Sequence, residues 1–147
     1  MWSKECSILL SKGLTIVGFL MTLFILPFVP VVTEFYDTIS GDDPVRFEFT
    51  VAVYIVLTFG IILIFTLFRL LNNISKKVIF VNQNTRYLRR ISWCCFFIAA
   101  ILFVLGIWVT RSVLVAFVAG FMGLILRILK NVFEEAVSIR EENDYTI

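Results

Sequence analysis

The sequence predicts an all-α fold, an integral membrane four-helix bundle with both termini in the cytoplasm. Three observations favour this fold. Hydrophobic residues make up 60% of the 147 residues, whereas soluble domains contain roughly 45–50%. Four apolar stretches are long enough to cross roughly 30 Å of hydrocarbon. A basic segment without acidic residues separates the second stretch from the third, and such segments stay in the cytoplasm because Lys and Arg resist translocation.

The first predicted span covers residues 13–33. Lys4 and Lys12 precede it, which places the N-terminus inside. A secretory signal peptide is the alternative, but the apolar run is too long for a usual signal core and no A-x-A cleavage site follows it. We therefore expect an uncleaved anchor. Pro27 lacks a backbone donor and is expected to kink the outer end of this span.

An acidic outer loop is predicted over residues 34–49, and S-G-D-D-P at residues 40–44 is a turn signature. The D-x-D-x-D-G spacing of a calcium loop is absent, so a solvated loop is the preferred interpretation over a cation site. The second predicted span covers residues 50–71. Arg69 lies at its inner end, where its side chain can extend to the headgroups.

The basic cytoplasmic loop is predicted over residues 72–91. Its cations are Lys76, Lys77, Arg86, Arg89 and Arg90. Asn82 or Asn84 is expected to cap a helix that continues into the third span. The same cations attract anionic lipid at about 1 kcal/mol each. Lipid contact is preferred over direct nucleic-acid binding, which is not expected because no recognition motif accompanies the charges.

The third predicted span covers residues 92–109, with Trp93 and Trp108 near the two interfaces. A short outer turn, residues 110–112, makes the third and fourth spans an antiparallel hairpin. The fourth predicted span covers residues 113–128 and carries a stripe of small residues that lets another helix approach closely. The stripe consists of Ala116, Ala119, Gly120 and Gly123. Packing within the chain is the default explanation, and a homodimer seam is the alternative.

A cytoplasmic acidic helical tail is predicted over residues 129–147. Its acids include Glu134, Glu135, Glu141 and Glu142. Asn143 is expected to end the helix, because Asn tolerates the left-handed conformation. The basic loop and the acidic tail share one side of the membrane, so they either pair with each other or each binds a partner.

Two motifs carry a resemblance to a known family. They are F-V-N-Q-N-T-R-Y-L-R-R-I-S-W at residues 80–93 and E-E-N-D-Y-T-I at residues 141–147. With four spans in one short chain, these motifs resemble the bacterial membrane family catalogued as domain of unknown function 2975. The matching positions are Phe80, Asn84, Leu88, Arg89, Trp93 and residues 142–147. Ile79, Ser92 and Tyr145 depart from the usual Pro, Gly and Leu, which weakens any expectation of one fixed loop geometry.

The resemblance implies a protein of the bacterial cytoplasmic membrane with no transferable catalytic residue. Family members are often encoded beside a small helix-turn-helix regulator, so the resemblance implies a membrane protein that holds or modulates a cytoplasmic transcription regulator. The candidate partner- or lipid-binding residues are Lys76, Lys77, Phe80, Asn84, Arg86, Leu88, Arg89, Arg90, Glu141, Glu142, Asn143, Asp144 and Ile147.

No enzyme, cofactor or metal site is expected. The chain has no His, which removes the commonest general base and metal ligand. Cys94 and Cys95 are adjacent and lack the C-x-x-C redox spacing, so they are expected to fill space. A small dimeric transporter or channel is the alternative function. Carriers usually keep an ionisable group within the membrane, but Glu34, Arg69 and Arg127 lie at span ends. The available hydroxyls are expected to bond to their own helices.

Overall fold

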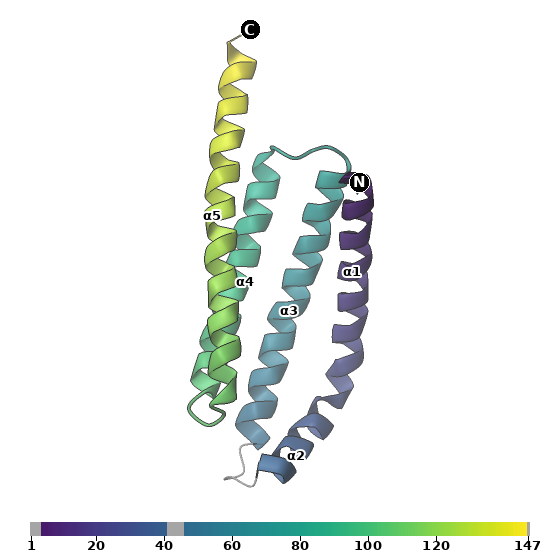
Figure 1. Ribbon diagram of the computed structural model, residues 1–147, viewed down its shortest axis with the longest axis vertical. Helices are drawn as coiled ribbons and strands as arrows, with labels where there is room; N and C mark the ends of the chain where they lie inside the picture. Colours follow the sequence, from purple (N-terminus) through teal and green to yellow (C-terminus); the bar gives the residue numbers. More distant parts are fainter. Residues whose placement is uncertain (1–3, 41–45, 147) are drawn as a thin grey trace.

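A computed structural model describes residues 4–40 and 46–146, and these residues form helices joined by short connections (Figure 1). The elements are α1 (Lys4–Ile25), the 3₁₀ turn η1 (Leu26–Phe28), α2 (Val29–Ser40), α3 (Arg46–Ser75), α4 (Asn82–Leu105) and α5 (Arg111–Tyr145). No strand occurs in the described residues. The predicted all-α four-helix fold is confirmed.

Four helical segments are long and apolar enough to cross a membrane. They are Glu5–Ile39, Arg46–Ser75, Asn82–Leu105 and Arg111–Tyr145. Large apolar side chains cover their outer surfaces, and Leu9, Leu114 and Phe117 are each more than 70% exposed. Exposure of so much contiguous apolar surface to water is unfavourable, whereas lipid chains solvate it. The chain is therefore a multi-pass integral membrane protein.

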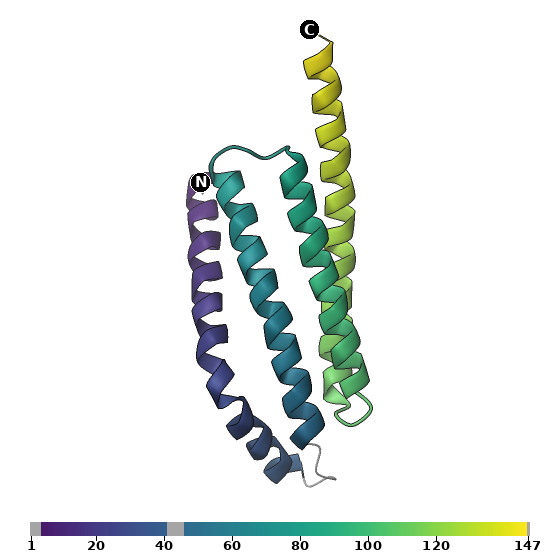
Figure 2. The same cartoon turned by 180° about the vertical axis from the view of Figure 1, so that it is seen from behind.

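The helices pack in the order in which they occur along the chain. α5 lies along α4, α4 lies along α3, and α3 lies along α1, whereas α1 and α5 form no comparable interface (Figures 1 and 2). The start of α1, the α3–α4 connection and the C-terminal part of α5 share one end of the bundle, which we call the termini end. The α4–α5 connection lies at the opposite end, the turn end.

The first span bends where two prolines remove backbone donors. Pro27 lies in the 3₁₀ turn η1, and Pro30 is the second residue of α2. Neither proline can donate to the carbonyl four residues before it, so the regular helical bonding of α1 is interrupted and α2 leaves in a new direction. Figure 2 shows this bend between α1 and α2. The predicted kink at Pro27 is confirmed.

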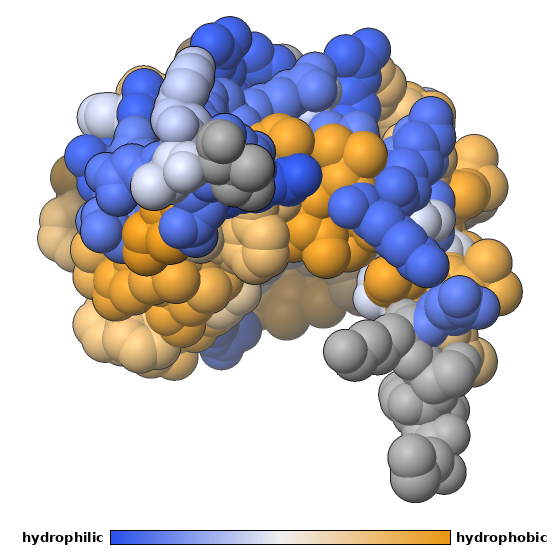
Figure 3. Space-filling view, turned by 90° about the horizontal axis from the view of Figure 1, so that it is seen from above, coloured by the Kyte–Doolittle hydropathy of each residue, from blue (hydrophilic) through white to orange (hydrophobic). Residues whose placement is uncertain are grey.

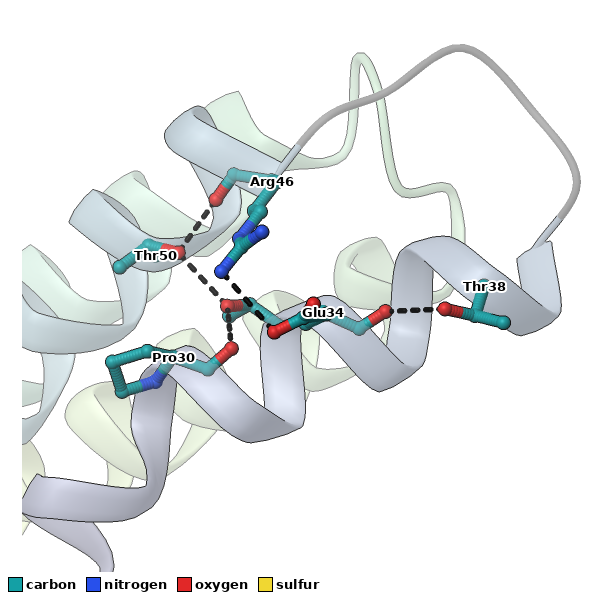
Figure 4. Close-up of polar contacts among 6 residues, drawn as sticks. Pro30, Glu34, Thr38, Arg46 and Thr50 are labelled. Carbon is teal, nitrogen blue, oxygen red and sulfur yellow. Dashed lines mark hydrogen bonds and ion pairs between the residues drawn. The ribbon is translucent and has the colours of Figure 1, made fainter.

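The predicted outer loop over residues 34–49 is mostly helix, so that prediction is wrong. α2 continues to Ser40 and α3 already begins at Arg46, and the turn signature lies outside the described residues. Arg46 forms a 3.3 Å ion pair with Glu34, and the Thr50 hydroxyl lies 3.0 Å from that of buried Thr33. Figure 4 shows these contacts crossing from α3 to α2. Packing between α2 and α3 therefore keeps this polar segment helical.

The small-residue stripe of α5 faces α4. Ala116 and Gly123 are buried, and Ala119 and Gly120 are half-buried. A Cβ added at Gly123 would lie 3.3 Å from the Cβ of Cys95. The Ser92 hydroxyl donates a 2.9 Å hydrogen bond to the Gly123 carbonyl, which requires a close approach of the helices. Packing within the chain therefore accounts for the stripe without a second copy.

The α4–α5 connection is longer than the three residues predicted. α4 ends at Leu105, four residues before the predicted end of the third span, and α5 begins at Arg111. Gly106 follows α4, and a Cβ there would lie 2.9 Å from the Phe103 carbonyl oxygen. The Ser112 hydroxyl lies 2.8 Å from the carbonyl oxygens of Leu102 and Val109. These contacts produce the antiparallel hairpin that the sequence predicts.

Candidate functional site

The α3–α4 connection at the termini end consists of residues 76–81 only. Within the predicted cytoplasmic segment, residues 72–91, α3 extends to Ser75 and α4 begins at Asn82, at the point where the sequence predicts that a new helix starts. Lys77 has φ 61°, and its N–H donates to the Ile74 carbonyl at 3.0 Å. The Val78 N–H donates to the Asn73 carbonyl, also at 3.0 Å. This pair of bonds is the Schellman arrangement, which most often has Gly at the left-handed position.

Asn84 clamps this connection from beneath. Its side chain is completely buried, and its amide nitrogen donates to the carbonyls of Val78 and Ile79 at 2.8 and 2.7 Å. Its amide oxygen accepts a 2.8 Å bond from the Asn73 side chain of α3. The expected capping role of Asn82 or Asn84 is wrong, because Val81 precedes the helix and makes no side-chain cap. Asn84 instead donates to two backbone carbonyls of the connection, which have no partner in a regular helix.

A hydrophobic cluster supports the clamp. Its buried members are Leu70, Tyr87, Leu88, Ile91 and Cys95. Leu88 is 5% exposed. Leu88 and Asn84, both candidate contact residues, therefore position the face and do not form its surface. Lys12 donates a 3.1 Å hydrogen bond to the Asn72 side chain, which attaches the start of α1 to the end of α3.

The basic segment and the acidic tail are in direct contact. Asn82 donates a 3.0 Å hydrogen bond to the Glu141 carboxylate. Arg140 donates to the Phe80 carbonyl at 3.3 Å, and the Phe80 and Phe133 rings are 5.8 Å apart. The sequence left two alternatives, that the basic loop and the acidic tail pair with each other or that each binds a partner. For Phe80, Asn82, Arg140 and Glu141, the contacts are between the two segments. The α3–α4 connection is thereby held against α5.

One acidic side chain in this contact is Glu134. It forms a 3.6 Å ion pair with Arg89 and a hydrogen bond with Lys130. Glu134 lies about 35 Å along α5 from Arg111 at about 1.5 Å per residue, beyond roughly 30 Å of hydrocarbon. The hydrogen bond from Lys130, aided by the charges of Lys130 and Arg89, holds the pKa of Glu134 below its ordinary value. Its carboxylate therefore remains charged at neutral pH.

Other candidate contact residues stay on the surface. They are Lys76, Lys77, Arg86, Arg90, Glu142, Asn143 and Asp144. Figure 3 shows hydrophilic side chains over much of this end, with hydrophobic side chains between them and along its margin. Asn143 does not end α5, because the helix continues to Tyr145 and extends beyond the other helices. Ile147 lies outside the described residues.

The residues proposed for chemistry or transport make structural contacts. Cys94 and Cys95 are both buried, and no group of three or more metal-ligating side chains occurs among residues 4–40 and 46–146. Several span hydroxyls donate to the carbonyl four residues earlier in their own helix. These hydroxyls belong to Thr15, Thr22, Thr58 and Thr66.

The fold and this face define a class, the multi-pass integral membrane proteins with a polar face at one end of the helical bundle. Residues 29–147 match the family described as "Protein of unknown function (DUF2975)". The chain therefore belongs to that family, as its motifs indicate. The match includes α2 to α5, the Asn84 clamp and the extension of α5. No curated protein and no solved structure matches the chain.

Proposed function

We propose that this membrane protein is non-enzymatic and binds a cytoplasmic protein through the exposed residues of its termini end. The observation that carries the proposal is the attachment of the α5 extension to the α3–α4 connection. Contacts of Arg140 with Phe80 and of Glu141 with Asn82 join two polar segments that are distant in the sequence. A rigid face loses little conformational freedom when it binds, so more of its contact energy contributes to affinity.

The distribution of cations supports a cytoplasmic location for this face. The chain has 13 Lys and Arg residues, all within the described ranges. Only Arg46 and Arg111 begin helices at the turn end, whereas the others lie in the half of the bundle nearer the termini end. Lys and Arg accumulate in cytoplasmic segments. This favours an orientation with both termini inside, and a bacterial cytoplasmic membrane is proposed from the family resemblance alone.

The exposed charges support a protein partner with its own charge pattern. Arg86 and Arg90 are exposed on α4 and form no ion pair within the described part of the chain. Glu142 and Asp144 present negative charge on the adjoining α5 surface. Separate patches of opposite sign favour one orientation of a complementary partner. A small helix-turn-helix regulator, which the family resemblance implies, is the partner that we propose.

Transport has less support from the contacts. The threonine hydroxyls within the spans bond to their own backbone, as described above. Arg69 lies at the inner end of α3, with its guanidinium carbon 5.0 Å from the centre of the Phe65 ring. A solute pathway usually requires polar groups that are free to face it.

The test is affinity purification of the tagged full chain from its own cells in mild detergent, followed by mass spectrometry of the retained soluble proteins. The variant Arg86→Glu/Arg90→Glu reverses two exposed charges. The amount of partner retained by this variant is expected to fall about tenfold or more, because the new glutamates would lie against acidic groups of the partner. A photo-crosslinking residue at Glu142 is expected to join the same partner covalently.

The matched control is Arg111→Glu, which reverses an exposed charge at the turn end. It is expected to retain the partner fully. Equal retention by wild type, the double variant and the control would refute the proposed face. Retention of no soluble protein, together with solute uptake by liposomes that contain the purified chain, would favour transport instead.

A further inference from the structure

A pocket of about 260 Å³ lies between α4 and α5 near the termini end. Its lining consists of Arg89, Ser92, Trp93, Arg127 and Lys130. Three of these side chains are cations at neutral pH. The pocket is smaller than the roughly 300–1,000 Å³ that drug-sized ligands occupy, so it suits a group of headgroup size.

The position of the pocket along the helices matches a membrane interface. Lys130 lies about 28 Å along α5 from its first residue, Arg111, at about 1.5 Å per residue. The hydrocarbon core is about 30 Å thick, so this residue lies near the level of the lipid headgroups. Trp93 is half exposed beside it, and indole rings are enriched at this depth. The phosphates of a bilayer lie at the same level.

The cations of the pocket are only partly neutralised within the chain. Glu134 interacts with both Arg89 and Lys130, so one carboxylate serves two cations. The Arg127 guanidinium carbon is 5.7 Å from the centre of the Trp93 ring, and Arg127 has no acidic partner in the described residues. The Lys130 side chain is only 14% exposed. Arg89 and Arg127 are exposed, so an external anion can reach them and supply negative charge beyond that of Glu134.

We propose that this pocket binds the phosphate group of an anionic membrane phospholipid. Arg and Lys donate charge-assisted hydrogen bonds to phosphate oxygens, and the planar guanidinium can donate two at once. The site lies between α4 and α5 and differs from the exposed face proposed for a protein partner. Its lipid would also hold α5 against α4 where the helix leaves the bilayer. Soluble phosphate is the other source of the same chemistry.

The test is native mass spectrometry of the full chain, purified in detergent and titrated with phosphatidylglycerol or phosphatidylcholine. One phosphatidylglycerol is expected to remain bound per chain, in preference to phosphatidylcholine. Arg127→Gln/Lys130→Gln is expected to weaken this binding about tenfold or more, because each change removes a charged hydrogen-bond donor. Arg69→Gln is the matched control, since it removes a cation that also lies over an aromatic ring, but on α3. The control is expected to bind as wild type does.

A gain in affinity separates the proposal from simple loss of folding. Glu134→Gln removes the carboxylate that pairs with Arg89 and Lys130, and this variant is expected to bind phosphatidylglycerol severalfold more tightly. Equal retention of the two lipids by wild type would overturn the proposal, and so would equal loss of binding in the Arg69→Gln control. Displacement of the lipid by millimolar inorganic phosphate would overturn lipid as the source and assign the pocket to a soluble phosphate.

Discussion

The Asn84 clamp allows the clearest quantitative prediction about the α3–α4 connection. Its amide makes three hydrogen bonds, to Asn73, Val78 and Ile79, from a completely buried position. Each such bond contributes about 1 kcal/mol net. Asn84→Ala should therefore lower the free energy of local opening by about 3 kcal/mol, because all three bonds are lost.

Trypsin provides the assay, because Lys76 and Lys77 lie within the exposed connection. Cleavage of a folded segment follows the population of its opened form when opening is fast. A loss of about 3 kcal/mol then predicts roughly 100-fold faster cleavage after these lysines in the detergent-solubilised chain. Mass spectrometry of the fragments identifies the cleaved bond, so cutting elsewhere does not interfere.

Gln83→Ala is the matched control. Gln83 is the neighbouring amide residue, but it is exposed and bonds only to the Tyr87 hydroxyl among the described contacts. Its loss should change the cleavage rate by no more than about fivefold, equivalent to about 1 kcal/mol. If Asn84→Ala and Gln83→Ala were cleaved at equal rates, the connection would not depend on the buried amide and the reasoning would be refuted.

Three further predictions test other parts of the structure. Lys77→Gly should stabilise the connection by about 1 kcal/mol, because glycine adopts the positive φ of this residue without strain, and a raised thermal midpoint in detergent would show it. Gly123→Val should lower that midpoint, by about 1–3 kcal/mol in stability, because its side chain would overlap the neighbouring helix α4. Gly60→Val is its control, since nothing lies within 4 Å there, and an equal loss in both would contradict the packing argument. Thr38→Cys should react with an impermeant thiol reagent on intact cells and Arg86→Cys should not, whereas the reverse labelling would overturn the proposed orientation.

Much of the architecture is predictable because lipid imposes simple rules. A helix must satisfy its backbone bonds internally and present apolar side chains to the hydrocarbon. Runs of apolar residues therefore indicate the helices without knowledge of their neighbours. The kink at Pro27 is predictable in the same way, because its missing backbone donor interrupts any helix that contains it.

The errors fall where a contact with another helix decides the local structure. The segment after Thr33 includes polar side chains typical of a loop, but it remains helical; Glu34 contacts Arg46 of α3, and the preceding Thr33 contacts Thr50. Asn84 resembles a helix cap, but the carbonyls of the folded connection lie close enough to accept its amide protons. Glu34 pairs with Arg46 of the next helix, and Asn84 bonds to carbonyls five and six residues earlier that become available only once the connection has folded. Local propensity reports neither partner.

The sequence indicates which residue types form the candidate contact face and at which end of the bundle they lie. The uneven distribution of charged residues along the chain is enough to show both. The sequence does not indicate which side chains are available. Leu88 is part of a buried cluster, whereas Arg86, two residues away, is exposed, because α4 has neighbours on some faces only.

The pocket between α4 and α5 cannot be predicted from the sequence. Arg127 and Lys130 are identifiable as interface cations, but Arg89 and Ser92 join them only because the hairpin places the two helices antiparallel in one register. The sequence by itself therefore determined the helices, their number and the end at which charge collects, because each depends on local composition in lipid. Only the tertiary structure decided which charges converge, because convergence depends on helix register, and register is set by close contacts such as the Ser92–Gly123 hydrogen bond.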